Sequence, residues 1–183
     1  WQMSLRVLDE ICSLLLQVDA ISLGASILAC EKGSQWHAAL VTLQEMKDLE
    51  VQINEVSVSS VVRACQSRGC WENALNVLST AFSWSVPVSS GAYNPALAAC
   101  CSSRSWERAL SLFATAMRSN FRPDEVSLTT LMSACEVGFQ WEYALGILFS
   151  FSDFDVQMDA TACNVAISSC SSLQKWRMAL ALL

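Results

Sequence analysis

One spacing of apolar residues recurs along the chain, each time behind a tryptophan. Small or hydrophobic side chains stand 3, 4 and 7 residues after it, as in Trp36, Ala39, Leu40 and Leu43. These offsets place the side chains on one face of an α-helix. The pattern follows Trp1 (with Ser4 in place of alanine), Trp36, Trp71, Trp106, Trp141 and Trp176. Each of these tryptophans is therefore predicted to open an amphipathic helix.

The pattern has a period of 35 residues. The six tryptophans are 35 residues apart, and five cysteines keep the same interval: Cys30, Cys65, Cys100, Cys135 and Cys170. A second apolar stripe with helical spacing precedes the tryptophan, most clearly at Leu128, Leu131, Met132 and Cys135. Short polar segments, such as residues 31–35, separate the two stripes. The repeating unit is therefore predicted to be helix–turn–helix.

One helical hairpin cannot bury both apolar faces, whereas stacked hairpins bury a continuous core. We therefore expect an all-α fold, an α-solenoid of 35-residue repeats that forms one domain. The predicted boundaries are a partial repeat (second helix) at 1–19, repeats at 20–54, 55–89, 90–124 and 125–159, and a partial repeat at 160–183. Because both ends fall inside a repeat, we expect a piece of a longer array, with any targeting segment outside it.

Local residues suggest where the helices begin and end. Ser22, Ser57 and Ser127 share one phase ahead of the first helix and are predicted to cap it. Pro87 and Pro123 are predicted to stop the second helix of their repeats, since proline lacks an N–H. Pro95 is expected in the first turn of its helix, where proline is tolerated.

Composition excludes several classes of protein. The chain is 53% hydrophobic and 15% charged, which argues against disorder. The longest apolar stretch, residues 14–23, is interrupted by Gln17, Asp19 and Ser22, so no membrane span is expected. The net charge of −6 argues against bulk electrostatic capture of nucleic acid or of an anionic membrane.

Three segments of the third repeat resemble the pentatricopeptide repeat: Gly91–Leu97, Trp106–Phe113 and Phe121–Asp124. Residues 27–33 with Ala39 and Leu40 are similar to the same consensus. The tetratricopeptide repeat differs from this pattern, because its period is 34 residues and its tryptophan, glycine and tyrosine have a different spacing. The resemblance implies a right-handed superhelix that binds single-stranded RNA, one base per repeat. It also implies an organellar protein of RNA processing, stability, editing or translation, without cofactor or small-molecule substrate.

In that family, two residues per repeat read the base. Transferred by phase, they are Gly24 with Asn54, Ser59 with Ser89, Asn94 with Asp124, and Thr129 with Asp159, followed by Asn164 of the last partial repeat. A carboxylate only accepts hydrogen bonds, and uracil and guanine carry a ring N–H on the edge that single-strand readers use. Asp124 and Asp159 should therefore favour uracil or guanine.

The pairing rules of the family narrow this expectation. Asn94 with Asp124 resembles a uracil reader and Thr129 with Asp159 a guanine reader, so 5′-N-N-U-G-3′ is expected over the complete repeats. Asn54 favours adenine weakly, and the Ser59–Ser89 pair is assigned no base. Base-stacking residues implied by phase are Ile21, Val56 and Val126, whereas Gly91 and Thr161 should stack less well. Phosphate-contact candidates are Lys32, Arg63, Arg68 and Arg104.

Other chemistry has little support in the sequence. No phosphate loop, zinc-protease helix or nucleophile elbow occurs, so we expect no catalytic residue and no enzyme. The cysteines show no paired C-x-x-C spacing and should be reduced packing residues, not metal ligands. The tryptophans should pack between hairpins, while Trp84, Phe149, Phe151 and Phe154 could cover the core or meet a partner. The acidic balance keeps a second hypothesis open, a protein-interaction scaffold.

Overall fold

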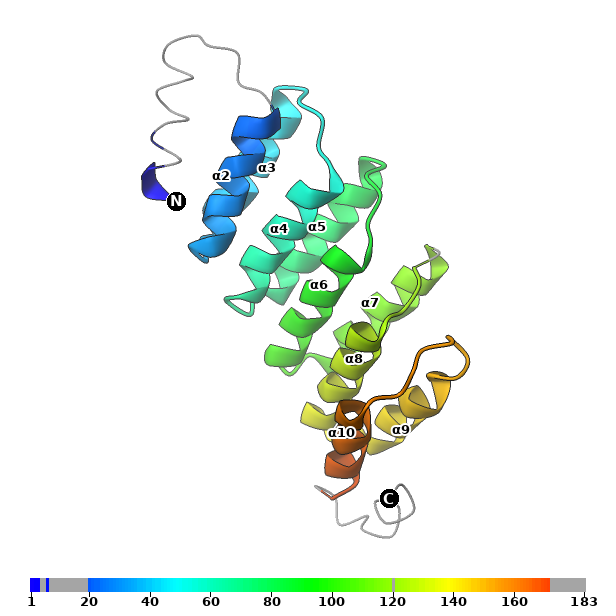
Figure 1. The fold of residues 1–183 in the computed structure, drawn as a ribbon. Helices are drawn as coiled ribbons and strands as arrows, with labels where there is room; N and C mark the ends of the chain where they lie inside the picture. The colour runs from blue at the N-terminus through cyan, green and yellow to red at the C-terminus, as the bar shows by residue number, and fades with distance from the viewer. Residues whose placement is uncertain (4–5, 7–19, 120, 172–183) are drawn as a thin grey trace. The chain divides into compact units, whose positions relative to one another are not determined.

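Every regular element of the described residues is an α-helix, as Figure 1 shows. A computed structural model describes residues 1–3, 6, 20–119 and 121–171. The helices are α2 (Ala20–Lys32), α3 (Trp36–Asp48), α4 (Glu55–Gln66), α5 (Trp71–Ser83), α6 (Ser90–Ser102), α7 (Trp106–Arg118), α8 (Glu125–Val137), α9 (Trp141–Ser150) and α10 (Ala160–Ser171). The all-α, solenoid fold class is confirmed. Most of the partial repeat 1–19 and residues 172–183 lie outside the described residues.

The chain divides into two compact units, Trp1–Ala99 and Cys100–Leu183. In the first unit, α2 packs against α3 and α4, and α4 packs against α5. In the second unit, α8 packs against α7, α9 and α10. Within each unit, consecutive first helices are therefore neighbours, α2 with α4 and α8 with α10. Their amino ends begin at Ala20, Glu55, Ser90, Glu125 and Ala160, 35 residues apart.

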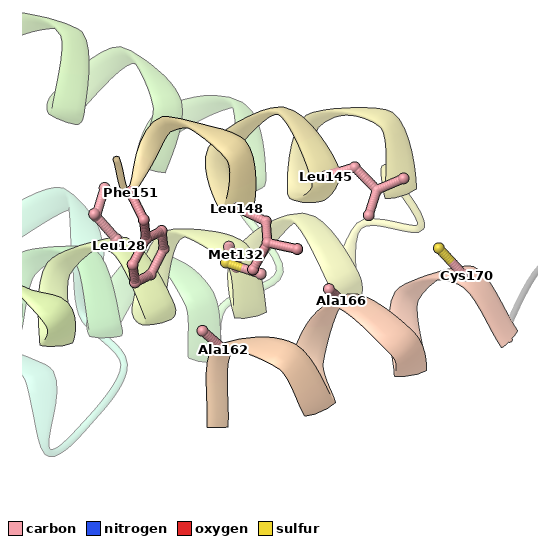
Figure 2. Close-up of a cluster of buried hydrophobic side chains, with 8 residues drawn as sticks. All are labelled: Leu128, Met132, Leu145, Leu148, Phe151, Ala162, Ala166 and Cys170. Carbon is pink, nitrogen blue, oxygen red and sulfur yellow. The ribbon is translucent and has the colours of Figure 1, made fainter. Parts of the chain in front are cut away.

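The core of the second unit lies among α8, α9 and α10. Figure 2 shows its buried members: Leu128, Met132, Leu145, Leu148, Phe151, Ala162, Ala166 and Cys170. Phe154 and Trp141 are partly buried and pack against this cluster. Phe151 and Phe154 therefore cover the core, whereas Phe149 is 65% exposed.

The periodic tryptophans pack onto the turn of the following repeat. A Cβ atom built on Gly138 would lie 2.4 Å from Cδ1 of Trp106, and one on Gly33 would lie 2.5 Å from Cδ1 of Trp1. Trp106 also lies 5.9 Å from the ring of Tyr143. The predicted packing role is confirmed at these positions. Trp84, which keeps another phase, is half-buried under Lys47, whose Nζ lies 5.5 Å from the ring centroid.

The periodic cysteines are buried and reduced. Cys30, Cys65, Cys100, Cys135 and Cys170 are all 0% exposed, and every cysteine of the described residues is a free thiol. Burial raises the pKa of Cys65 to about 12 and that of Cys100 and Cys135 to about 11. These thiols stay neutral near pH 7 and serve as small core residues. Cys12 lies outside the described residues.

Most of the described helices are followed by a left-handed residue whose position also repeats. At the hairpin turns these residues are Ser34, Gly69, Arg104 and Phe139, with φ between 53° and 66°. The next residue donates its N–H to the carbonyl oxygen of a periodic cysteine, as in Gln140 N to Cys135 O at 2.8 Å. This 6→1 bond is the Schellman closure. Most of these positions are not glycine. The turn is therefore formed despite the steric cost of placing a Cβ atom in the left-handed region.

The predicted helix stops are wrong in detail. The second helices α5 and α7 end at Ser83 and Arg118, several residues before Pro87 and Pro123. The chain leaves α5 through Ser85, with φ of 57°, and Val86 N donates to Ala81 O at 3.0 Å. A left-handed closure, not the missing N–H of proline, therefore terminates the helix.

Pro95 lies deeper in its helix than predicted. It is the sixth residue of α6, beyond the first turn. At this position proline removes a real intrahelical hydrogen bond, the one that residue 95 would donate to the carbonyl of Gly91.

Among the described residues, no helix has the length and apolar character required to cross a bilayer.

Candidate RNA interface at the amino ends of the first helices

The last residue of a repeat caps the first helix of the next repeat. Asn54 is the N-cap of α4, and its Oδ1 accepts from the N–H of Ser57 at 2.9 Å. Asp124 is the N-cap of α8, and its Oδ1 accepts from the N–H of Ser127 at 2.8 Å. The hydroxyl of Ser127 in turn accepts from the N–H of Asp124 at 2.9 Å, which completes a capping box.

The predicted serine caps are therefore wrong. Ser57 and Ser127 are the third residues of α4 and α8, and Ser22 is the third residue of α2. The residue three positions earlier holds the extended conformation that a cap requires, with φ −118° and ψ 170° at Asn54. Ser127 is the reciprocal partner of Asp124 inside the helix, and the hydroxyl of Ser57 donates to Oδ1 of Asn54 at 3.0 Å.

At two further predicted reader positions, a side chain also accepts a hydrogen bond from the amino end of a first helix, three residues ahead at Asp159 and two residues ahead at Ser89. Asp159 Oδ1 accepts from the N–H of Ala162 at 2.7 Å, and Ser89 Oγ accepts from the N–H of Gly91 at 3.2 Å. All four predicted last-position readers thus lie at the amino end of a first helix. Because a helix amino end carries partial positive charge, it stabilises the carboxylates of Asp124 and Asp159.

The charge of Asp159 is further stabilised by its neighbours. Hydrogen bonds from the Thr161 side chain and the Ala162 backbone lower the pKa of Asp159 below its usual value. The pKa of Glu125 is raised, because its side chain shares a hydrogen bond with Asp159 and feels that negative charge. Asp159 is therefore the more acidic carboxyl group of this pair.

The predicted stacking residues are exposed despite being aliphatic. Ile21, Val56 and Val126 are 80%, 57% and 59% exposed, each the second residue of its helix. Val56 and Val126 therefore stand two residues after Asn54 and Asp124, which cap their helices. An apolar surface beside a polar cap is a suitable platform for a base, which has an apolar face and a polar edge.

The predicted readers inside the first helices are less accessible. Ser59 is 6% exposed, and its hydroxyl donates to the carbonyl of Val56 at 3.0 Å. The Oγ1 atom of Thr129 is buried and has no hydrogen-bond partner within the described part of the chain. Asn94 is half-buried, whereas Asn164 is exposed. Gly24 has open space around its Cα, since an added Cβ would meet no atom within 4 Å.

The structure separates most of the cationic candidates from these amino ends. Lys32 is the last residue of α2, about 16 Å along the axis from Ile21 at ~1.5 Å per residue. Arg68 and Arg104 follow the ends of α4 and α6 and are exposed. Arg63 lies one turn after Ser59, but its guanidinium forms an ion pair with Glu31 at 2.9 Å.

Glu55 and Glu125 also lie at these amino ends, although no sequence motif pointed to them. Each is the first residue of a first helix and lies beside the last residue of its own repeat. Ser89 Oγ donates to the carboxylate of Glu55, and Glu125 shares a hydrogen bond with Asp159. These contacts span 34 residues of sequence, so no local motif announces them. No group of three or more potential metal ligands occurs in the described ranges.

Comparison with known proteins gives a consistent result. The family model "PPR repeat" matches residues 92–121. The PPR domain of Arabidopsis thaliana protein-only RNase P 1, solved in complex with tRNA, superposes with a TM-score of 0.76 at 17% identity, over 97% of this chain and 90% of that one. No curated protein matches the chain significantly by sequence.

Two longer proteins share the fold. Maize PPR10 gives a TM-score of 0.72 at 19% identity, covering 99% of this chain and 26% of that one. A. thaliana nuclear proteinaceous RNase P 2 gives 0.79 at 14% identity, covering 96% and 38%. PPR10 has also been solved with an 18-nucleotide psaJ RNA element. The chain therefore contains one segment that matches the PPR repeat model, and its fold is similar to that of solved PPR proteins.

Proposed function

We propose that this chain binds single-stranded RNA selectively, with bases against the amino ends of the first helices. One observation carries the proposal: a polar cap and an exposed aliphatic residue stand two positions apart at α4 and at α8. The cap offers a directed hydrogen-bond group and the aliphatic residue a stacking surface. The RNA complexes of two proteins with the same fold support this interpretation.

The caps determine what each reader offers to a base. Because Oδ1 of Asn54 faces the helix, its planar amide directs Nδ2 the other way, as a donor suited to adenine. Asp124 and Asp159 carry no donor when ionised, so they favour the ring N–H of uracil or guanine. With the pairing rules of the family, we propose 5′-U-G-3′ for repeats 90–124 and 125–159. The organellar setting and the processing step stay predictions from the family resemblance.

The test is a selection of the folded chain against a random single-stranded RNA pool at low and moderate salt. Enrichment of U followed by G is expected. Replacing Thr129 and Asp159 with asparagine together should move selectivity away from guanine at one position only, and the N-cap survives because asparagine caps as well as aspartate. Asp153→Asn, an equal charge change on an exposed loop, serves as the control and should leave the profile unchanged. A uniformly weakened profile in the double variant would contradict the assignment.

A protein-interaction scaffold is the second candidate. Phe139, Tyr143 and Phe149 are 59%, 53% and 65% exposed, and the net charge of −6 opposes RNA binding. Exposed aromatic residues are typical of protein-binding surfaces. Partners that remain bound to the chain after nuclease treatment, and are lost on Tyr143→Ala, would favour this candidate.

A further inference from the structure

The amino ends of α4 and α6 share a hydrogen-bonded group of three residues. The hydroxyl of Ser89 donates to Oε1 of Glu55 and accepts from the N–H of Gly91 at 3.2 Å. Its proton is therefore committed to Glu55. A Cβ atom on Gly91 would lie 3.9 Å from Glu55 Oε1, so the carboxylate lies beside the position that Val56 and Val126 occupy in their own helices.

The two expected readers of this repeat have little left to offer a base. Ser59 is buried, and its hydroxyl already donates to Val56 O. Ser89 donates to one partner and accepts from another. An ionised carboxylate has about four acceptor positions, and the bond from Ser89 uses one of them. Glu55 is thus the side chain of this group with hydrogen-bonding capacity in reserve.

We propose that Glu55 selects the base bound by repeat 55–89, and that this base carries a ring N–H, as uracil and guanine do. The inference rests on the proposed RNA-binding function and adds a specificity-determining residue to it. Ser89 is a positioning residue here, since it orients the carboxylate. Adenine and cytosine would place a ring acceptor against a carboxylate, which leaves both groups unpaired.

The same positional relation recurs in repeat 125–159. Glu125 and Asp159 are also 34 residues apart and share a hydrogen bond. In repeats 20–54 and 90–124 the corresponding first residues are Ala20 and Ser90, which bring no carboxylate. In two of the complete repeats, a third side chain thus joins the two expected readers, and it is acidic. In repeat 55–89 it is the one carboxylate of the group.

The test uses the whole chain and four RNAs that share the core 5′-A-X-U-G-3′, with X as U, G, A or C. Fluorescence anisotropy at low salt measures each dissociation constant. U and G at X should bind about tenfold tighter than A and C, the effect of one charge-assisted hydrogen bond. Glu55→Gln retains an oxygen for Ser89 but offers N–H groups, so the preference should vanish or reverse. Glu72→Gln, an equal charge change on exposed α5, should keep it.

The variants separate the alternatives. Ser89→Ala should weaken the preference at X without reversing it, because the carboxylate stays. An equal gain of affinity for all four RNAs in Glu55→Gln would mean that Glu55 acts only through its charge, and an equal loss would mean that it acts only on the fold; either result would overturn the inference. Selection of U-G at the last two positions with indifference at X would overturn it while leaving RNA binding intact. Absence of any selective binding by the folded wild-type chain would overturn the proposed function, and this inference with it.

Discussion

Replacing Gly138 with alanine tests how consecutive repeats are joined. A Cβ atom at this position would lie 2.4 Å from Cδ1, 2.6 Å from Cγ and 3.1 Å from Cβ of Trp106. Carbon atoms pack at about 3.5–4.0 Å, so the indole must move by roughly 1 Å. The atoms closest to the glycine are those nearest the tryptophan backbone. A rotation of the outer ring therefore does not relieve the contact, and α7 itself must shift.

The expected cost follows from two opposing terms. Overpacking of this kind destabilises by about 1–3 kcal/mol. Alanine also gains about 0.5–1 kcal/mol over glycine, because φ −82° and ψ 1° at residue 138 are accessible to any residue. The free energy of unfolding should therefore fall by roughly 1–2 kcal/mol. Urea unfolding followed by circular dichroism measures this change at equilibrium.

Two further variants isolate the contact. Gly146 lies inside α9, and an added Cβ would meet no atom within 4 Å. Gly146→Ala should therefore stabilise the chain by about 0.5–1 kcal/mol. With Trp106→Ala as background, Gly138→Ala should be neutral or stabilising, which gives a coupling energy of about 1–3 kcal/mol. The packing argument fails if Gly138→Ala stabilises as Gly146→Ala does, or costs the same with and without the indole.

Three other predictions follow from the described geometry. Asp124→Ala should lower the free energy of unfolding by about 1 kcal/mol through loss of the N-cap of α8, whereas Asp124→Asn should stay within a few tenths, as urea unfolding would show. Phe139→Gly should stabilise by about 1 kcal/mol, since φ there is 58°, and an unchanged midpoint would contradict the strain argument. From pH 8 to pH 10, the free energy of unfolding should fall by about 4 kcal/mol through Cys65, Cys100 and Cys135. In the unfolded chain these thiols ionise near the ordinary pKa of 9.0, whereas in the folded chain their pKa values are about 11–12. The unfolded chain therefore binds fewer protons in this range, which favours unfolding. Cys65→Ala should make this pH dependence shallower.

The helices and their core were predictable because burial leaves a periodic trace. Trp106, Leu110 and Cys135 recur with their equivalents at 35 residues, and a fixed phase reports which side of a helix meets its neighbour. The helix ends were harder to predict from this periodicity. Arg104 and Phe139 hold left-handed conformations, which sequence normally announces by glycine. Packing of the hairpin maintains the turn at these positions, so the left-handed conformation cannot be predicted from the residue type.

The candidate interface was predictable in position and only partly in chemistry. The family resemblance supplied the aliphatic positions and the last-position readers, and the 35-residue phase transferred them to this chain. The cap was misplaced by three residues, because in a capping box both Asp124 and Ser127 carry a side chain that bonds the other's backbone. Only the extended backbone of Asp124 decides which of them lies outside the helix. The contact of Glu55 with Ser89 joins the amino ends of α4 and α6 across 34 residues of sequence, and no local pattern encodes it.

Under the proposed function, the last residue of a repeat has two roles, capping a helix and reading a base, and this restricts how base preference can change. That position must cap a helix, and only short polar side chains and glycine do so without loss. Asn54, Ser89, Asp124 and Asp159 all belong to that set. A change to an apolar residue would remove base recognition and about 1 kcal/mol of stability together. Exchange between aspartate and asparagine retains the cap while turning an acceptor into a donor, so it is the substitution by which a repeat changes its base at least structural cost.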